Sequence, residues 1–262
     1  MAFRSEKMLT RDKLVLITGA SDGIGAACAN EFRRRGARLI LTGRTPAKLE
    51  RVSQAGETQI AGNLTDGTFL AKLAEYPVDI LVNCAGVGLY GPPSRTDLEL
   101  MRRMFEVNFF AAVALTSRIV PGMKERGRGV VVNVSSVAGL VTLPWMTYYS
   151  ASKFALNSYT EGLRSDLKGT GVHVMAVCPG YVKTDFQAHV LEGDPPESIR
   201  KAKRFAVTAE QCAAALADGV EREARTVVTP GSTRLLVGLA RLVPGVVESQ
   251  LAAMNRRLET ER

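Results

Sequence analysis

A tyrosine and a lysine, Tyr149 and Lys153, are the residues whose types and spacing most clearly suggest chemistry. At positions i and i+4 of a helix, their side chains lie on one face. A phenol with its ordinary pKa of about 10 is a poor acid or base at neutral pH, but a nearby ammonium group stabilises the phenolate and lowers that pKa. The pair is therefore a candidate for proton transfer, although such pairs are common on helix surfaces and one pair alone indicates little.

Hydroxyl and amide side chains accompany this pair. Ser135 and Ser136 follow an apolar run at residues 129–134, just before the helix of the tyrosine. A hydroxyl there can bind a substrate carbonyl while a tyrosine gives or takes the proton. Asn108 interrupts the apolar face of a predicted helix, so its buried amide must either satisfy the backbone or hold a water for a proton relay.

A glycine-rich segment, TGASDGIG at residues 18–25, lies between the first apolar run and the first helical pattern. Glycines let the backbone turn tightly there and approach a pyrophosphate, while the helix N-terminus offers unpaired N–H groups to the anion. The spacing is TGxxxGxG, not the commoner GxGxxG. A glycine-rich turn after a strand is often only a turn, but its place at the first strand–helix junction favours nucleotide binding.

Arg44 follows the second apolar run, where the adenosine ribose of a dinucleotide would lie. An acidic residue at this position would bind the 2′-hydroxyl of NAD(H), whereas a guanidinium fits a 2′-phosphate. A solvated arginine at a turn is the alternative. We interpret Arg44 as a phosphate contact, which predicts NADP(H) rather than NAD(H).

The elements that must position these residues alternate along the chain. Strands are expected at residues 14–18, 39–42, 58–61, 80–83, 129–134, 172–177 and 226–229, and helices at 26–35, 46–52, 66–75, 97–118, 149–167 and 208–217. Gly122 is an alternative end for the helix that begins at residue 97. Strands that are apolar on both faces fit a parallel sheet covered on both sides, so we predict a doubly wound, three-layer α/β sandwich.

Composition limits the class of protein. Hydrophobic residues make up 46% and charged residues 23% of the 262 residues, which excludes a disordered chain. The net charge of +8 indicates either a solvated basic surface or an anionic partner. No long block of Lys and Arg occurs, so we expect no nucleic-acid binding.

Cysteine and histidine usage argues against a metal site. The four cysteines form no CxxC pair, and His173 and His189 are the only histidines. Free, mostly buried thiols suit a reducing cytoplasm. Residues 1–13 contain no apolar core of a signal peptide, and no run reaches the roughly 18 apolar residues of a spanning helix. We therefore expect a cytoplasmic protein.

These motifs together resemble the short-chain dehydrogenase/reductase (SDR) family over residues 14–231. The glycine-rich segment, the NCAG turn at residues 83–86, the serine, the Tyr-x-x-x-Lys pair and Pro179-Gly180 with Thr184 occur in the order and spacing of that family. The resemblance implies a Rossmann-type fold and an oxidoreductase that transfers a hydride between a nicotinamide cofactor and a carbonyl or alcohol. It also implies that the chain forms a homodimer or homotetramer.

The resemblance assigns roles residue by residue. Tyr149 is similar to the acid/base of the family, Ser136 to the serine that binds the carbonyl, and Lys153 to the lysine that lowers the tyrosine pKa and binds the nicotinamide ribose. Asn108 is similar to the residue that anchors a relay water, whereas Ser135 and Tyr148 are neighbours to be discounted. The implied catalytic set is Asn108, Ser136, Tyr149 and Lys153. The implied cofactor contacts are Gly19, Ser21, Asp22, Gly23, Ile24, Gly25, Arg44, Asn63, Leu64, Asn83, Ala85, Gly86, Tyr149, Lys153, Pro179, Gly180, Val182 and Thr184.

Three positions depart from the family pattern. Asn63 stands where an aspartate is usual, and Cys84 replaces a second asparagine of the turn. Asp22 occupies a place where some NADP-preferring members carry a basic residue. Its negative charge weakens the prediction of NADP(H), which then depends on Arg44.

The segments expected to reach the substrate are mainly apolar. They are residues 87–95, 138–147 and 181–204, and the expected substrate contacts are Ser136, Leu143, Tyr149, Tyr181 and Phe186. The wall favours an apolar ketone, aldehyde or secondary alcohol; the alternative for each of these residues is packing only against the protein.

We expect one domain over residues 1–262, with a substrate-loop insert at about 183–207 and an apolar tail at about 235–254. Proline and glycine in the insert suit a mobile lid, and its basic cluster Arg200–Arg204 is a solvated face or a contact for an anionic substrate tail. The apolar tail is expected to pack on the core or on another subunit. Attachment to a membrane surface is the less favoured alternative.

Two other functions remain open from the sequence. The chain could be a nucleotide-sensing protein that keeps the fold without turnover, or an interaction protein of the membrane surface. The complete set of Ser136, Tyr149 and Lys153 argues against a sensor, because a sensor has no chemical use for it. The sequence does not identify the substrate.

Overall fold

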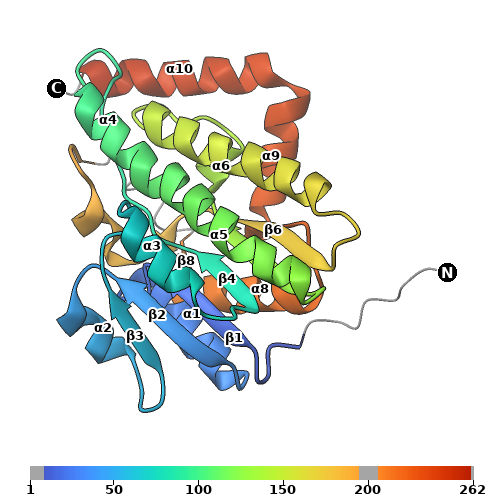
Figure 1. The fold of residues 1–262 in the computed structure, drawn as a ribbon. Helices are drawn as coiled ribbons and strands as arrows, with labels where there is room; N and C mark the ends of the chain where they lie inside the picture. Colours follow the sequence, from blue (N-terminus) through green and yellow to red (C-terminus); the bar gives the residue numbers. More distant parts are fainter. Residues whose placement is uncertain (1–8, 195–205, 261–262) are drawn as a thin grey trace.

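Seven short apolar strands form one parallel sheet in the order β3-β2-β1-β4-β5-β6-β9 (Figure 1). The computed structural model describes residues 9–194 and 206–260. The strands are β1 (Leu14–Thr18), β2 (Arg38–Gly43), β3 (Thr58–Ala61), β4 (Ile80–Asn83), β5 (Gly129–Val134), β6 (Val172–Pro179) and β9 (Thr226–Thr229). β1 pairs with both β2 and β4, so the strand order reverses there, and ligands bind at such a switch point in open α/β sheets.

Helices cover both faces of the sheet because successive strand residues point to opposite sides. In β1, Val15 and Ile17 face one core, and Leu16 faces the other. The first core includes residues of α1 (Gly23–Arg34), α2 (Pro46–Val52) and α8 (Ala209–Glu221). The second includes residues of α3 (Gly67–Ala74), α5 (Ala111–Glu125) and the C-terminal part of α6 (Thr147–Asp166). The predicted doubly wound α/β sandwich is confirmed.

The helix predicted at residues 97–118 is longer and is interrupted. It consists of α4 (Leu98–Phe105), a π-helical turn (Glu106–Phe110) and α5, which ends at Glu125. Neither Pro121 nor Gly122 ends α5, because Leu115, Ile119 and Met123 continue the apolar stripe that is buried against the sheet. Burial of a stripe with this spacing outweighs the weak helix propensity of both residues.

The segment Leu98–Glu125 is long and apolar enough to cross a membrane by length and composition, contrary to our expectation from the sequence. Within it, Leu115, Ile119 and Met123 pack in the core beside the sheet, and 44% of the most apolar window is buried inside the protein. Within the part of the chain that the structure describes, α9 (Thr233–Leu242) and α10 (Pro244–Thr260) meet the same criterion only as a pair bent by 106°.

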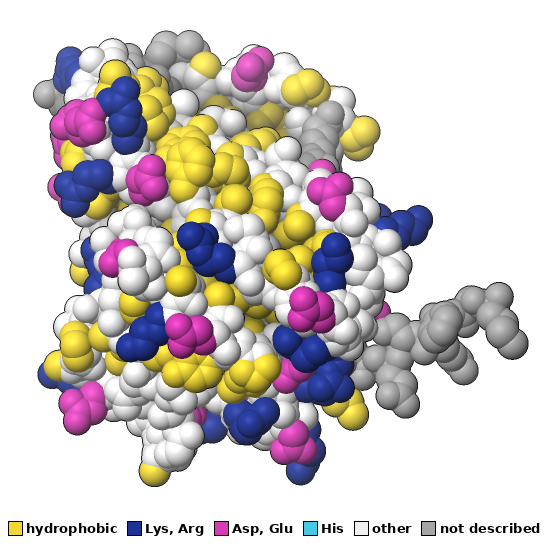
Figure 2. Space-filling model, in the orientation of Figure 1, with side chains coloured by type: hydrophobic (Ala, Val, Ile, Leu, Met, Phe, Trp, Pro, Cys, Tyr) yellow, Lys and Arg dark blue, Asp and Glu magenta, His cyan; other side chains and the backbone are white. Residues whose placement is uncertain are grey.

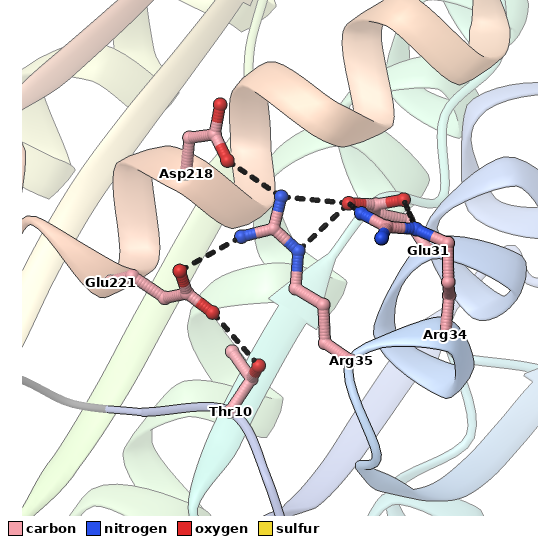
Figure 3. A network of polar contacts seen from close by, with 6 residues as sticks. All are labelled: Thr10, Glu31, Arg34, Arg35, Asp218 and Glu221. Carbon is pink, nitrogen blue, oxygen red and sulfur yellow. Dashed lines mark hydrogen bonds and ion pairs between the residues drawn. The ribbon is translucent and has the colours of Figure 1, made fainter.

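An ion-pair network fixes the C-terminal end of α1 against α8 (Figure 3). Arg35 contacts Glu31 of its own helix at 2.7 Å, Asp218 at 2.6 Å and Glu221 at 3.0 Å. Thr10, which precedes β1, donates a hydrogen bond to Glu221. The network therefore joins three segments that are distant in sequence and helps to set the direction in which the other end of α1 points.

The expected insert and tail are built from short elements. After β6 come β7 (Val182–Lys183), a 3-10 turn (Asp185–His189) and β8 (Val207–Thr208), which pairs with β7. The basic cluster Arg200–Arg204 lies outside the described residues. The tail forms α9 and α10; in Figure 1, α10 runs along the top of the molecule and α9 lies below its right end, at a steep angle to it. Leu235 and Leu242 of α9 are 81% and 82% exposed.

Candidate active site

A cleft of about 770 Å³ opens at the carboxyl ends of β1, β4, β5 and β6. It brings together side chains from distant parts of the chain. The predicted site residues that line it are Gly19, Ser21, Asp22, Gly23, Ile24, Gly25, Arg44, Asn63, Leu64, Ala85, Gly86, Ser136, Leu143, Tyr149, Lys153, Pro179, Gly180, Tyr181, Val182, Thr184 and Phe186. The predicted residues Asn83 and Asn108 do not line it.

The glycine-rich turn is too tight for side chains. A Cβ on Gly25 would lie 2.1 Å from the carbonyl oxygen of Gly19, and one on Gly19 would lie 2.8 Å from the Cα of Ala85. Gly19 also has a φ of +66°, which favours glycine. The backbone thus forms an open cradle at the N-terminus of α1, and this cradle fits the pyrophosphate of a dinucleotide.

The structure separates the two adjacent serines. Ser135 is 4% exposed and its hydroxyl donates to the carbonyl oxygen of Lys153, which is an internal structural bond. Ser136 lines the cleft, accepts a hydrogen bond from the backbone N–H of Ala138 at 3.1 Å, donates to the carbonyl oxygen of Pro179 at 3.5 Å, and lies close enough to the Tyr149 hydroxyl to lower its pKa. Ser136 is therefore the serine beside the tyrosine. Tyr148 instead donates to the carbonyl oxygen of Pro93 outside the cleft.

Lys153 lies deep under Tyr149. Its ammonium group donates to the carbonyl oxygen of Val134 at 3.0 Å and lies 5.8 Å from the centroid of the Tyr149 ring. Burial lowers the pKa of Lys153 to about 8. Burial also raises the pKa of Tyr149 to about 12, and the hydrogen bond from Ser136 partly opposes this. We expected Lys153 to lower the pKa of Tyr149, but in the structure this pKa is raised, because the loss of solvation on burial is the largest effect.

Asn108 lies in the π-helical turn and is 1% exposed. Its side-chain oxygen accepts from the N–H of Val87 at 2.8 Å, and its amide nitrogen donates to the carbonyl oxygen of Val87 and to Ser152. The sequence left open whether this amide satisfies the backbone or holds a relay water. In the structure, the side chain hydrogen-bonds both backbone groups of Val87. A Cβ on Gly86 would lie 3.3 Å from the side-chain oxygen of Asn108 and 3.5 Å from the ammonium nitrogen of Lys153. The Asn108 amide and the Lys153 ammonium group therefore both lie next to this glycine.

The side chain of Asn83 points away from the cleft, so it does not lie where a side-chain contact to a cofactor was expected. It is 3% exposed and donates to Thr116 of α5 and to Asn133 of β5. Asn133 in turn donates to Thr160 of α6. At the end of β4 the strand alternation directs this side chain to the α5 side, where it joins a buried polar chain that connects the sheet to two helices.

Charged groups stand at the entrance of the cradle. Arg44 is exposed and lines the cleft without a hydrogen bond or ion pair to any other described residue. Asp22 caps α1, since its carboxylate accepts from the N–H of Gly23 at 2.6 Å, and its other oxygen lies 3.2 Å from a ring nitrogen of His189. The Asp22 carboxylate is therefore engaged, whereas the Arg44 guanidinium is available.

The other end of the cleft is apolar. Leu143 and Phe186 line it beside Tyr149, and the rings of Tyr149 and Phe186 meet edge to face at 6.0 Å. Tyr181 accepts a hydrogen bond from the side-chain amide of Gln187 at 2.9 Å. Its phenol therefore supplies a polar group within this wall.

Several lining residues were not named individually as site residues from the sequence. Val87, Tyr90, Gln187 and His189 lie within the segments expected to reach the substrate, and Cys84 was named only as a departure from the family pattern. Ser232, Thr233 and Leu251 lie outside the segments expected at the site. Ser232 and Thr233 follow the last strand, so the rule that ligands bind at the carboxyl ends of parallel strands could have indicated them. No local signal identifies Leu251, which reaches the cleft from α10.

Comparison with known proteins agrees with this geometry. The sequence profile described as short chain dehydrogenase matches residues 13–195. Dehydrogenase/reductase SDR family member 7B of Mus musculus is 31% identical over 270 residues, which cover 96% of this chain and 84% of that protein. The Danio rerio protein of the same name is 37% identical over 70% of this chain, but this chain spans only 65% of that protein. The uncharacterized oxidoreductase YbbO of Escherichia coli K12 is 33% identical over 96% of this chain and 99% of its own length.

Solved structures have the same architecture. A short-chain dehydrogenase/reductase from Burkholderia phymatum in complex with NAD superposes with a TM-score of 0.82 at 25% identity, covering 91% of this chain and 96% of its own. A short-chain dehydrogenase from Burkholderia cenocepacia in complex with NADP superposes with a TM-score of 0.81 at 25% identity, covering 93% and 99%. This chain therefore belongs to the short-chain dehydrogenase/reductase family of NAD(P)-dependent oxidoreductases.

Proposed function

We propose that the chain transfers a hydride between NADP(H) and the carbonyl or secondary alcohol of an apolar substrate, with Tyr149 as the acid/base. One observation carries this proposal. Tyr149 and Ser136 line the same cleft, which is apolar at its other end, and the buried ammonium group of Lys153 lies 5.8 Å from the centroid of the Tyr149 ring. Proton donor, oxygen-binding hydroxyl and cation thus meet at one place.

In the direction of reduction, the residues of this chain hold and move one proton. Ser136 donates a hydrogen bond to the substrate oxygen, and the O–H of Tyr149 transfers its proton to that oxygen as the carbonyl becomes an alcohol. Lys153 and Ser136 then stabilise the phenolate that remains. The dinucleotide, when bound, supplies or accepts the hydride. The cradle of residues 18–25 would hold its pyrophosphate, with Lys153 at the nicotinamide ribose.

The available guanidinium of Arg44 supports a preference for NADP(H). A 2′-phosphate at the entrance of the cradle would meet this charge and the nearby hydroxyl of Ser21, whose oxygen lies 3.0 Å from the Cβ position of Gly43. The negative charge of Asp22, which departs from the family pattern, should repel a 2′-phosphate less than a free carboxylate would. The N-terminus of α1 and His189 already engage its carboxylate.

The decisive experiment removes one oxygen atom. Tyr149→Phe should retain the fold and NADPH binding but lose turnover of a simple aryl ketone by at least about 100-fold, since general acid–base catalysis contributes on this scale. Tyr148→Phe is the matched control, because it removes the neighbouring phenol oxygen, which lies outside the cleft. NADPH oxidation is followed by absorbance. Near-normal turnover by Tyr149→Phe would refute the assignment and reopen a role in nucleotide sensing.

We also propose that the chain forms a homo-oligomer through the face of α4, α5 and α6. Figure 2 shows apolar side chains gathered on this face, and Leu98, Phe110 and Phe154 are 51%, 50% and 40% exposed on its helices. Burial of exposed aromatic groups is a common source of subunit affinity. Phe110→Ser should lower the molar mass of the oligomer measured by light scattering. Leu242→Ser is the comparison variant, because it tests an oligomer contact through the tail instead. A mass that falls only with the tail variant would refute this choice of face.

A further inference from the structure

Tyr90 occupies a fixed position in the apolar end of the cleft. It follows β4, is 5% exposed, and lines the cleft near Tyr149. Its backbone N–H donates to the carbonyl oxygen of Glu192 at 3.0 Å. Gly193 crosses so closely that a Cβ on it would lie 2.2 Å from the Tyr90 carbonyl oxygen, and the φ of Gly193 is +79°. The substrate loop thus holds the Tyr90 backbone, and burial in the core holds the ring.

The hydroxyl of Tyr90 has no hydrogen-bond partner within residues 9–194 and 206–260. This oxygen is not completely buried, and Tyr90 lines the cleft, so a molecule in the cleft can reach it. A tyrosine this deeply buried normally pairs its hydroxyl. The phenols of Tyr148 and Tyr181 both do so. An unpaired phenol facing the cleft therefore points to a ligand atom.

Electrostatics keep this phenol in its neutral, proton-donating form. Burial raises the pKa of Tyr90, and the neighbouring phenols of Tyr181 and Tyr149 raise it further. The three phenols all line the cleft, and Tyr90 and Tyr149 belong to the same apolar cluster. A hydrogen-bond donor of fixed position thus lies beside the proposed acid/base, in addition to Ser136 at the reacting oxygen.

The surroundings of this donor are otherwise apolar. Val87, Leu143, Met146 and Phe186 line the same part of the cleft. A plain hydrocarbon ketone that covers this wall would displace water from the Tyr90 hydroxyl without giving it a partner, which is unfavourable. A substrate with a second oxygen would satisfy it.

We propose that the Tyr90 hydroxyl donates a hydrogen bond to a second oxygen of the substrate, so that the preferred substrates are apolar carbonyl compounds with an additional hydroxyl or carbonyl group. This inference rests on the proposed function and names its substrate class. Tyr90 is a specificity-determining residue in this scheme. It does not itself transfer the proton, and Tyr149 and Ser136 keep their roles.

The test compares matched substrates in matched variants. The substrates are propiophenone and phenyl ketones of similar length that carry a hydroxyl or second carbonyl one to three carbons from the reacting carbonyl. The variants are wild type, Tyr90→Phe and, as a control outside the cleft, Tyr148→Phe. The measured quantity is the ratio of kcat/KM between each oxygenated ketone and propiophenone. In Tyr90→Phe this ratio should fall by about 3- to 10-fold for at least one spacing, as expected for one neutral hydrogen bond.

The change should appear mainly in KM, because the bond is present in both the ground state and the transition state. The ratios of Tyr148→Phe should equal those of wild type. If Tyr90→Phe and wild type show the same ratio at every spacing, the proposed subsite is wrong while the oxidoreductase assignment stands. If wild type reduces none of the ketones with either NADPH or NADH, the proposed function fails, and the subsite fails with it.

Discussion

Replacing Lys153 by methionine should increase the stability of the chain while abolishing its activity. The ammonium group is 4% exposed, and burial lowers its pKa from the ordinary 10.5 to about 8. The shift corresponds to about 3 kcal/mol of unfavourable free energy when the group is charged. Methionine avoids this cost but leaves the Val134 carbonyl without its donor, a loss of about 1 kcal/mol. The variant should therefore be about 2 kcal/mol more stable at pH 7.

The dependence on pH has a definite sign. Because the folded pKa of Lys153 lies below the unfolded value, the unfolded chain binds more protons between about pH 8 and 10.5, so the stability contributed by this group rises with pH. The penalty is fully present below about pH 8 and is relieved as the pH approaches 10.5. The advantage of the methionine variant should thus shrink by about 2 kcal/mol between pH 7 and pH 10.

Urea unfolding without added cofactor, at pH 7 and pH 10, measures this difference. Lys168→Met serves as the control, since Lys168 is exposed and follows the end of α6. Its stability difference from wild type should be small and the same at both pH values. The prediction fails if the difference in unfolding free energy between Lys153→Met and wild type is the same at pH 7 and pH 10, or if the variant is the less stable protein at pH 7. Either result would show that the buried ammonium group carries no such cost. The same protein should lose NADPH affinity and turnover, because the lysine is proposed to contact the ribose and stabilise the phenolate.

Three further outcomes are expected. Arg44→Gln should weaken NADPH binding about tenfold and NADH binding much less in a fluorescence titration, and equal effects would show that Arg44 does not read the 2′ position. Asn108→Ala should lower the free energy of unfolding by about 2 kcal/mol as well as turnover, since the amide holds both polar groups of the Val87 backbone. Arg35→Gln should cost about 1–2 kcal/mol at pH 7 in thermal unfolding. The hydrogen bond from Arg34 and those from Arg35 lower the pKa of Glu31. The stability that Glu31 gives the fold is therefore present above the ordinary pKa of 4.5 and is lost as the pH falls through the lowered value. If wild type remains more stable than Arg35→Gln in acid, this reasoning is wrong.

Local patterns in the sequence determined the architecture and much of the site. Strand and helix periodicity identified the alternating elements, and parallel strands place their carboxyl ends together, so the glycine-rich turn and the Tyr149–Lys153 pair had to meet. Both signals are local, because a turn needs its glycines and a helix face needs its spacing within a few residues.

Only the tertiary structure decided which neighbours these residues have. The resemblance already favoured Ser136 over Ser135, but the partner of the Ser135 hydroxyl and the inward direction of Asn83 depend on the packing of β4 and β5 against helices distant in sequence. The sequence placed Tyr90 only within a segment expected to reach the substrate and gave no signal for Leu251, because what defines their roles is a cleft wall assembled from separate segments. The pKa of Lys153 likewise depends on burial rather than on spacing. Spacing specifies which side chains share an element, whereas solvation and hydrogen-bond partners follow from long-range packing, which no short segment encodes.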